Sequence, residues 1–153
     1  MKNSSFFLLL LFANLSLFAQ PSLSISSNKS VVVERMPRQA MTTISGDYTQ
    51  IQATVNYFDG LGRPLQSIIH KGSGDALFDI AANASTYDKF GRSQRTYTNF
   101  PASPDGGFHG IPTQIHGDTA AYSAPIFYDN SPLNRVLKSY GAGQAWRVNQ
   151  KKC

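Results

Sequence analysis

The sequence predicts an all-β fold made of short antiparallel hairpins, and three observations lead to this prediction. Polar and apolar residues alternate in several segments, most clearly in YTQIQATVNYF at 48–58, and alternation with a period of two is typical of a half-buried strand. No apolar pattern with helical spacing persists for three turns. A turn motif, aromatic-Asp-x-x-Gly-Arg, occurs at 58–63 and again at 87–92. Repetition at a period of a few tens of residues indicates a stacked array.

The first half of the chain is expected to form three strands. Residues 30–33 are mostly β-branched and should begin the ordered region. Residues 48–58 follow, and their apolar parity consists of Ile51, Ala53, Val55 and Tyr57. The turn at 59–62 leads into a third extended segment at 65–70. A Gly-containing turn at 71–75 closes this half.

The second half begins with the best helical candidate in the chain. This candidate, LFDIAANA at 77–84, is barely two turns long. A short polar strand at 83–87 and an alternating strand at 93–100 should follow. Residues 101–118 are rich in Gly and Pro and predict a long irregular connection.

Two further short strands are expected at 122–128 and 135–140. They flank the turn residues Asn130, Ser131 and Pro132.

The repeated turn motif supplies the candidate site residues, whose expected role is structural. They are Tyr57, Phe58, Asp59, Gly60, Gly62 and Arg63 in the first copy, Tyr87, Asp88, Gly91 and Arg92 in the second, and Tyr128, Asp129 and Arg135 in a looser third copy. In the third copy the gap between Asp and Arg is two residues longer, and an insertion takes the place of the Gly.

The chemistry of the motif predicts a closed hairpin loop. The Asp carboxylate can accept hydrogen bonds from backbone N–H groups two residues on. The Gly can adopt a positive φ, which a tight loop requires. The Arg begins the return strand, where it faces the Asp across the loop mouth. The aromatic residues are expected to pack between neighbouring hairpins.

The chain organisation predicted from composition has four parts. Residues 1–20 are expected to be a signal peptide, because Lys2 precedes the unbroken apolar run at 6–12. Residues 21–29 should form a flexible lead-in, 30–147 the domain, and 148–153 a tail. The single cysteine, Cys153, cannot form an intramolecular disulfide.

The charge pattern gives no indication of a nucleic-acid partner. The net charge is +5, but apart from Lys151 and Lys152 the basic residues are scattered. Proteins that bind nucleic acids usually gather their positive charge on one face or helix. A membrane contact is expected only through the signal peptide during export.

Candidate catalytic and cofactor sites are weak. His109, His116 and Asp118 could together supply three metal ligands, although a solvated loop is the expected alternative. The glycines of Gly141–Gln144 lack the following helix that a dinucleotide site needs. The Asp residues of the hairpins could act as paired carboxylates, but each has an Arg at a fixed spacing, which favours a structural ion pair. No catalytic residue, metal or cofactor is therefore expected.

Tyrosines on the predicted strands leave one binding function open. A carbohydrate-binding face could be formed by Tyr48, Tyr57, Tyr87, Tyr97 and Tyr140. The alternative is that these rings pack within the sheets, where aromatic residues are favoured.

Three segments of the chain resemble a known family. YFDGLGRPLQSI, TYDKFGRSQRTYTNFP and FYDNSPLNRVLKSYGAGQAW are similar to the N-terminal domain of unknown function that precedes the YD repeats of large secreted Rhs-type proteins of Gram-negative bacteria. The resemblance covers residues 31–147. It implies a part of a β-shell array that in many members encloses a toxin and in others serves at the cell surface. Such proteins carry many more repeats, so a truncated product is expected.

The sequence analysis therefore predicts a secreted or cell-surface protein, exported across the inner membrane, with a non-enzymatic structural role. It would start or cap a β-repeat shell, and its partners would be the remaining repeats of the array. The alternative is a surface module that binds carbohydrate or a partner cell. A metal-dependent enzyme is the third hypothesis.

Overall fold

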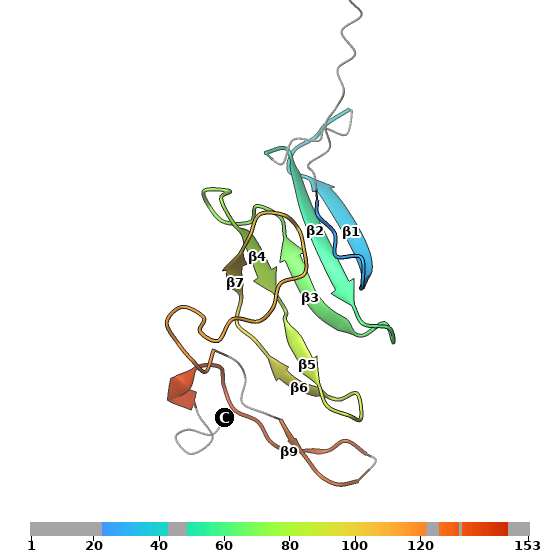
Figure 1. Ribbon diagram of the computed structural model, residues 1–153, viewed down its shortest axis with the longest axis vertical. Coiled ribbons are helices and arrows are strands. Elements are labelled where there is room, and N and C mark those ends of the chain that lie inside the picture. The colour runs from blue at the N-terminus through green and yellow to red at the C-terminus, as the bar shows by residue number, and fades with distance from the viewer. Residues whose placement is uncertain (1–22, 43–48, 122–125, 132, 147–153) are drawn as a thin grey trace, which may run out of the picture.

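The computed structural model describes residues 23–42, 49–121, 126–131 and 133–146, and this part of the chain is all-β (Figure 1). The expected fold class is confirmed. The elements are β1 (Ser30–Pro37), β2 (Ile51–Phe58), β3 (Pro64–Ile69), β4 (Asp79–Ala82), β5 (Ser85–Tyr87), β6 (Ser93–Thr96), β7 (Phe100–Ala102), β8 (Phe127–Tyr128), β9 (Val136–Lys138) and a 3₁₀ turn at Gln144–Trp146.

Five of the strands form one antiparallel sheet in the order β1-β2-β3-β4-β7. Along β2, buried side chains alternate with half-buried ones, as the alternating sequence predicts. The buried side chains of β2 are Ile51, Ala53, Val55 and Tyr57. The predicted apolar face of this strand is therefore confirmed, and the strand begins at Ile51.

The core lies on one face of this sheet, where Val55, Tyr57 and Ile68 are fully buried. The loop that follows β7 passes over this face (Figure 1). Phe108 in that loop packs edge-on against Tyr57, with ring centroids 5.6 Å apart. Leu23, which precedes β1, also packs against the core. The irregular connection expected at 101–118 therefore covers the sheet.

Two hairpins lie outside this sheet. β5 pairs with β6, and β8 pairs with β9, each as a two-stranded antiparallel unit. The loops of the β2–β3, β5–β6 and β8–β9 hairpins lie one below another along one side of the molecule (Figure 1). This alignment places the three copies of the turn motif next to one another.

The helical candidate at 77–84 does not form a helix, because this segment contains β4. Backbone pairing to β3 on one side and to β7 on the other places β4 inside the sheet. Tertiary pairing overrides the local helical preference of a segment that is too short to form a stable helix alone. Asn83 then takes a positive φ of 53° and turns the chain into β5.

The strand expected at 93–100 divides into β6 and β7, which belong to different sheets. Between them, Tyr97 N–H donates to the Ala84 carbonyl at 2.9 Å and Thr98 N–H to the Ala121 carbonyl at 3.0 Å. These two bonds fix the backbone of the segment that connects the β5–β6 hairpin to β7 at the edge of the five-stranded sheet.

The segment expected to be a flexible lead-in is attached to the sheet from Leu23 onward. Ser24 N–H donates to the Asp105 carbonyl at 2.6 Å. Ser26 N–H donates to the Tyr57 hydroxyl at 3.3 Å, and its own hydroxyl accepts from Phe108 N–H at 3.0 Å.

The ends of the chain lie outside the described residues, including the expected signal peptide at 1–20 and the tail at 148–153. Within the described residues, no helix has the length and apolar character needed to cross a membrane.

Candidate functional site

The first copy of the turn motif forms a closed loop around the Asp59 carboxylate. Its Oδ1 accepts hydrogen bonds from the N–H groups of Leu61 and Arg63, both at 2.9 Å. Its Oδ2 is bound by two nitrogens of the Arg63 guanidinium, Nε and Nη2, each at 2.6 Å. The Asx turn and the Asp–Arg pair predicted from the sequence are both present.

The second copy repeats this arrangement at Asp88. Its Oδ1 accepts from Phe90 N–H at 2.9 Å and from Arg92 N–H at 3.0 Å, while Arg92 Nε donates to Oδ2 at 2.7 Å. In both copies the Asp N–H also donates to the Arg carbonyl at 3.0 Å.

The third copy keeps the same ion pair despite its two extra residues. Arg135 Nε donates to Asp129 Oδ2 at 2.7 Å, and Asp129 N–H donates to the Arg135 carbonyl at 2.9 Å. Ser131, in the longer loop, adds a further bond to the aspartate: its hydroxyl donates to Asp129 Oδ2 at 2.8 Å. The insertion is therefore absorbed within the loop.

A residue with positive φ precedes the Arg in every copy. Gly62 has a φ of 77° and Gly91 a φ of 80°, as predicted. Asn134 occupies the same place in the third copy with a φ of 52°. Sequence analysis missed Asn134, although Asn is the side-chain-bearing residue that most readily takes this conformation.

The strand register is also repeated. In each hairpin the residue before the Asp pairs with the residue after the Arg, and a β-bulge follows. The pairs are Phe58 with Pro64, Tyr87 with Ser93, and Tyr128 with Val136.

The three Asp carboxylates are held in the ionised form. The Arg63 N–H bond is the main cause that lowers the pKa of Asp59 from its ordinary value of 3.8. For Asp88, burial raises the pKa, but the bonds from Arg92 and Phe90 together outweigh it and the pKa is lowered. The Ser131 hydroxyl is the main cause that lowers the pKa of Asp129. General acids at neutral pH need a raised pKa, so these carboxylates fit structural ion pairs.

Arg63 of the first hairpin also contacts the second hairpin. The Arg63 guanidinium lies 4.5 Å from the centroid of the Tyr87 ring, and the Tyr87 hydroxyl donates to the Pro64 carbonyl at 2.7 Å. Tyr87 is thus held by the first hairpin at both its ring face and its hydroxyl.

The same contact joins the second and third hairpins. The Arg92 guanidinium lies 4.4 Å from the centroid of the Tyr128 ring, and the Tyr128 hydroxyl donates to the Ser93 carbonyl at 2.9 Å. We refer to the three hairpin loops at 58–63, 87–92 and 128–135, joined by these contacts, as the hairpin stack.

The hairpin stack ends with an exposed guanidinium. The Arg135 side chain is 69% exposed, whereas those of Arg63 and Arg92 are 31% and 19% exposed. Among the described residues no aromatic ring stacks on Arg135.

An exposed apolar side chain marks the tip of every loop. Leu61, Phe90 and Leu133 each stand immediately before the residue with positive φ, and each is exposed to solvent. We refer to these three side chains as the apolar row, which sequence analysis did not identify.

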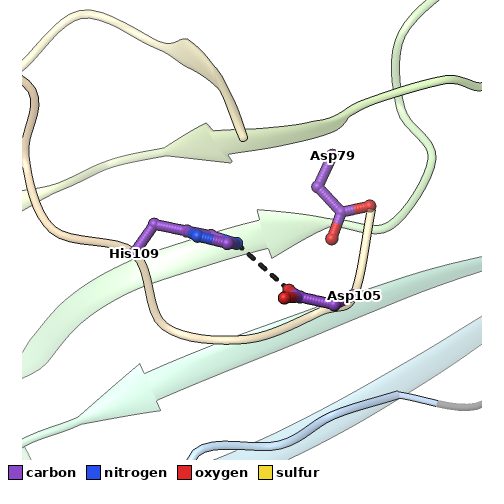
Figure 2. A group of neighbouring side chains, drawn as sticks. All are labelled: Asp79, Asp105 and His109. Atoms are coloured by element: carbon purple, nitrogen blue, oxygen red, sulfur yellow. Dashed lines mark ion pairs between the residues drawn. The ribbon is translucent and has the colours of Figure 1, made fainter. Parts of the chain in front are cut away.

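A second cluster, separate from the hairpin stack, combines Asp79 of β4 with Asp105 and His109 of the loop after β7 (Figure 2). One ligand atom from each side chain lies within 4.8 Å of the others. His109 Nε2 lies 3.3 Å from Asp105 Oδ1. This is the one group of three or more potential metal ligands within the described residues.

The buried Asp79 carboxylate connects the sheet to the loop. Its Oδ1 accepts from Lys71 N–H at 2.7 Å and lies 3.0 Å from His70 Nδ1. Its Oδ2 accepts from Gly106 N–H at 2.6 Å. His70, the residue after β3, therefore lies against the Asp79 carboxylate.

Gln66 of β3 fixes the position of His109. The His109 N–H donates to Gln66 Oε1 at 3.0 Å, and Gln66 Nε2 donates to the His109 carbonyl at 3.2 Å. Because the Gln66 side chain is buried, it holds the loop firmly to the sheet.

A family model described as a domain of unknown function, DUF6443, matches residues 32–153. The chain belongs to this family. The match contains the hairpin stack and the Asp79–Asp105–His109 cluster. No curated protein and no solved structure matches the chain. The expectation of a domain of unknown function is confirmed, and the link to Rhs-type proteins stays a prediction.

Within the DUF6443 domain, one motif residue lies away from its predicted place. Tyr57 was expected to pack between hairpins, but its ring is in the core and its hydroxyl donates to the Gly106 carbonyl at 2.7 Å. Tyr57 lies on the face of β2 that carries the buried apolar residues, and this places its ring in the core. Tyr87 and Tyr128 do lie between hairpins. Phe58 ends β2, and Gly60 is at an open part of the loop.

The His109–His116–Asp118 set is not brought together. His116 Nε2 lies 3.0 Å from the Asn99 carbonyl. The Asp118 carboxylate accepts from the N–H groups of Ala120 and Gln144, at 2.7 and 2.8 Å. His109 instead meets two aspartates that sequence analysis did not single out. A charged residue such as Asp79 in the apolar run FDIAA was the available signal, because buried charges need partners.

The five tyrosines considered for carbohydrate binding do not form one exposed face. Tyr57 and Tyr140 are buried, Tyr87 lies under Arg63, and Tyr48 is outside the described residues.

Proposed function

We propose that this DUF6443 domain is a non-enzymatic structural segment of an exported protein, in which it starts or caps an array of β-hairpins. The repeated Arg–Tyr contact is the observation that carries the proposal. The same ring and hydroxyl contacts join the first hairpin to the second and the second to the third. Repeat units of this kind bury their surfaces against their neighbours and depend on them for stability.

The hairpin stack has a direction that suits the start of such an array. Its first hairpin is the β2–β3 hairpin of the five-stranded sheet, and there the aromatic residue is Phe58, which has no hydroxyl. Its last hairpin presents Arg135 to solvent. We propose that the partners are further hairpins with the Tyr-Asp-x-x-Gly-Arg sequence, as in Rhs-type proteins.

The proposed partner site is Arg135 together with the Val136 carbonyl. By register, Val136 corresponds to Pro64 and Ser93, whose carbonyls accept the tyrosine hydroxyls of the following hairpins. A tyrosine placed over Arg135 would therefore find the same acceptor.

A hairpin peptide tests this proposal. A cyclised peptide with the sequence of residues 84–97 would be titrated into the ¹⁵N-labelled chain, because cyclisation removes part of the ordering cost. We expect saturable shifts at Arg135 and Val136, with at least tenfold weaker binding by the Tyr87→Ala peptide. Shifts spread evenly over the sheet, or equal responses to both peptides, would contradict the proposal.

Binding of a partner at the cell surface is a second candidate function, favoured by the apolar row Leu61, Phe90 and Leu133. Exposed apolar side chains that follow one edge are typical of contact surfaces. Binding of the labelled chain to whole cells should saturate and should be lost in a Leu61→Ser/Phe90→Ser variant. Unchanged binding by that variant would remove this candidate.

Export is part of the proposal and rests on residues 1–20. Expression of the full gene in a Gram-negative host should yield a periplasmic or secreted product that lacks about the first twenty residues. An intact N-terminus in the cytoplasmic fraction, measured by mass spectrometry, would argue against a signal peptide.

A further inference from the structure

The Asp79–Asp105–His109 cluster has the dimensions of a metal site. The three side chains come from β4 and from the loop after β7 and converge on one point (Figure 2). His109 Nε2 lies 3.3 Å from Asp105 Oδ1, which is longer than a charge-assisted N–H···O bond of about 2.7–2.9 Å. Ligands bound tetrahedrally at about 2.0–2.1 Å are about 3.3 Å apart, so this spacing matches a shared ion.

Two histidine nitrogens, one in the cluster and one beside it, lack ordinary hydrogen bonds. Within the described residues, His109 Nε2 and His70 Nδ1 are both buried, and neither makes a hydrogen bond of normal geometry. The His70 side chain is only 3% exposed and lies against Asp79. Buried polar atoms without a partner are rare in folded proteins, and the His109 Nε2 lone pair is a common metal ligand.

The charges of the cluster favour a cation. Asp79 is completely buried, and one of its carboxylate oxygens lies within 4.8 Å of a carboxylate oxygen of Asp105. Within the described residues, the ion-pair partners of these two aspartates are His70 and His109, whose imidazoles are charged only when protonated. A divalent ion bound by the neutral His109 imidazole would balance the charge of both carboxylates.

The ligands are already held in place by surrounding hydrogen bonds. Lys71 N–H and Gly106 N–H fix the two oxygens of Asp79, and each carboxylate oxygen has a second lone pair for a metal. The Gln66 side chain fixes the backbone of His109. Bonds of this kind orient the ligands of known metal sites.

We propose that Asp79, Asp105 and His109 bind one divalent first-row transition-metal ion, with Zn²⁺ as the test ion. One imidazole and two carboxylates form a ligand set that suits Zn²⁺, whereas Ca²⁺ and Mg²⁺ prefer ligand sets made of oxygen atoms alone. His109 also lines an open, mostly apolar groove with Phe78, Pro101 and Pro112. An ion that enters through this groove would meet His109 first.

Calorimetry on the whole chain tests the proposal. The protein would carry Cys153→Ser, which removes the one thiol, and no affinity tag, and it would be freed of metal by a chelator. ZnCl₂ is expected to bind with a stoichiometry of one and to raise the thermal midpoint. His109→Ala and Asp105→Asn should each weaken binding at least tenfold, and Asp105→Asn keeps the oxygen that accepts from Gly107 N–H.

His116→Ala is the matched control, because His116 lies in the same connection but bonds to the Asn99 carbonyl. It should bind Zn²⁺ like the parent. Circular dichroism would confirm that each variant is folded, and an imidazole ¹⁵N spectrum should show a zinc-dependent shift at His109 Nε2. The proposal would be overturned if the parent protein did not bind Zn²⁺ at micromolar concentration, or if His109→Ala bound Zn²⁺ with the same affinity as the parent. Tighter binding of Ca²⁺ than of Zn²⁺ would also overturn it.

Discussion

The five-stranded sheet and the hairpin stack are stabilised by different interactions. In the sheet, Val55, Tyr57 and Ile68 are fully buried, and apolar burial is the main favourable term in folding. In the hairpin stack, by contrast, the apolar side chains of Leu61, Phe90 and Leu133 are exposed. Asp–Arg pairs and Arg–Tyr contacts take their place. The same chain thus combines a unit with its own core and a unit that relies on its neighbours.

Stability is therefore expected to decrease along the hairpin stack. The first hairpin belongs to the five-stranded sheet, while β5–β6 and β8–β9 are isolated two-stranded units. Such units are marginal in water without further packing. Within the described residues, the third hairpin has a supporting neighbour on one side only, through Tyr128.

The largest effect is expected from Tyr57→Ala in the sheet. This change removes a fully buried ring, its edge contact with Phe108, and a hydrogen bond to the Gly106 carbonyl. Large-to-small changes of buried aromatic residues cost about 3–5 kcal/mol. Chemical denaturation should show loss of most or all of the cooperative transition.

Tyr57→Phe is the control, because it removes only the hydroxyl. We expect it to lower the free energy of unfolding by about 1–2 kcal/mol. If both variants unfolded like the parent protein, the core would have to lie elsewhere.

The next largest effect is expected from Gly91→Ala in the hairpin stack. Gly91 has a positive φ, and an added Cβ would lie 2.7 Å from Arg63 Nη1. Strain of this kind costs about 1–3 kcal/mol, and the displaced guanidinium would also leave Tyr87. Thermal unfolding should show the loss, and the Tyr87 amide should exchange faster.

Two glycines serve as comparisons for Gly91. Gly62→Ala meets no atom within 4 Å but has the same positive φ, so the strain alone should cost about 1–2 kcal/mol. Gly60→Ala meets neither obstacle and should be neutral. Equal effects at all three positions would show that the loop conformation does not matter.

The hairpins could be predicted from the sequence because their geometry is local. Asp, Gly and Arg at fixed spacing determine the Asx turn, the positive φ and the ion pair within six residues. The alternation of β2 likewise fixes which face is buried.

The long-range features could not be predicted, because they depend on which segments meet. The segment at 77–84 is a strand only because β3 and β7 pair with it on both sides. The Asp79–Asp105–His109 cluster joins Asp105 and His109, which are four residues apart, to Asp79, which is distant in sequence. No spacing rule connects Asp79 to the other two. The contact between Arg63 and Tyr87 likewise depends on how two separate sheets are arranged.

A smaller difference is expected between two arginines of the hairpin stack. Arg63→Ala removes the contact with Tyr87 as well as the pair with Asp59, and the ring contact alone contributes about 0.5–1 kcal/mol. Arg135→Ala removes only an exposed pair with Asp129, so its effect should be smaller. Thermal midpoints would rank the two variants. The reverse ranking would mean that the Arg–Tyr contacts do not stabilise the stack.

The smallest effect is a dependence on acidic pH that should be confined to the hairpin loops. The pKa values of Asp59 and Asp88 are lowered in the folded chain below the ordinary 3.8. A group whose pKa is depressed by folding contributes stability that is complete above its unfolded pKa and is lost as pH falls through the folded value. The loops should therefore loosen only below about pH 4.

Backbone amide signals can follow this loosening, because the N–H groups of Leu61 and Phe90 donate to Asp59 and Asp88. Both signals should shift together between pH 5 and 2, with midpoints below 3.8. In an Asp88→Asn variant the side-chain oxygen is retained but cannot titrate, so the Phe90 signal should stay constant while that of Leu61 still moves. A Phe90 signal that titrates as before in this variant would assign the acid response to another group and separate it from the Asp–Arg pair.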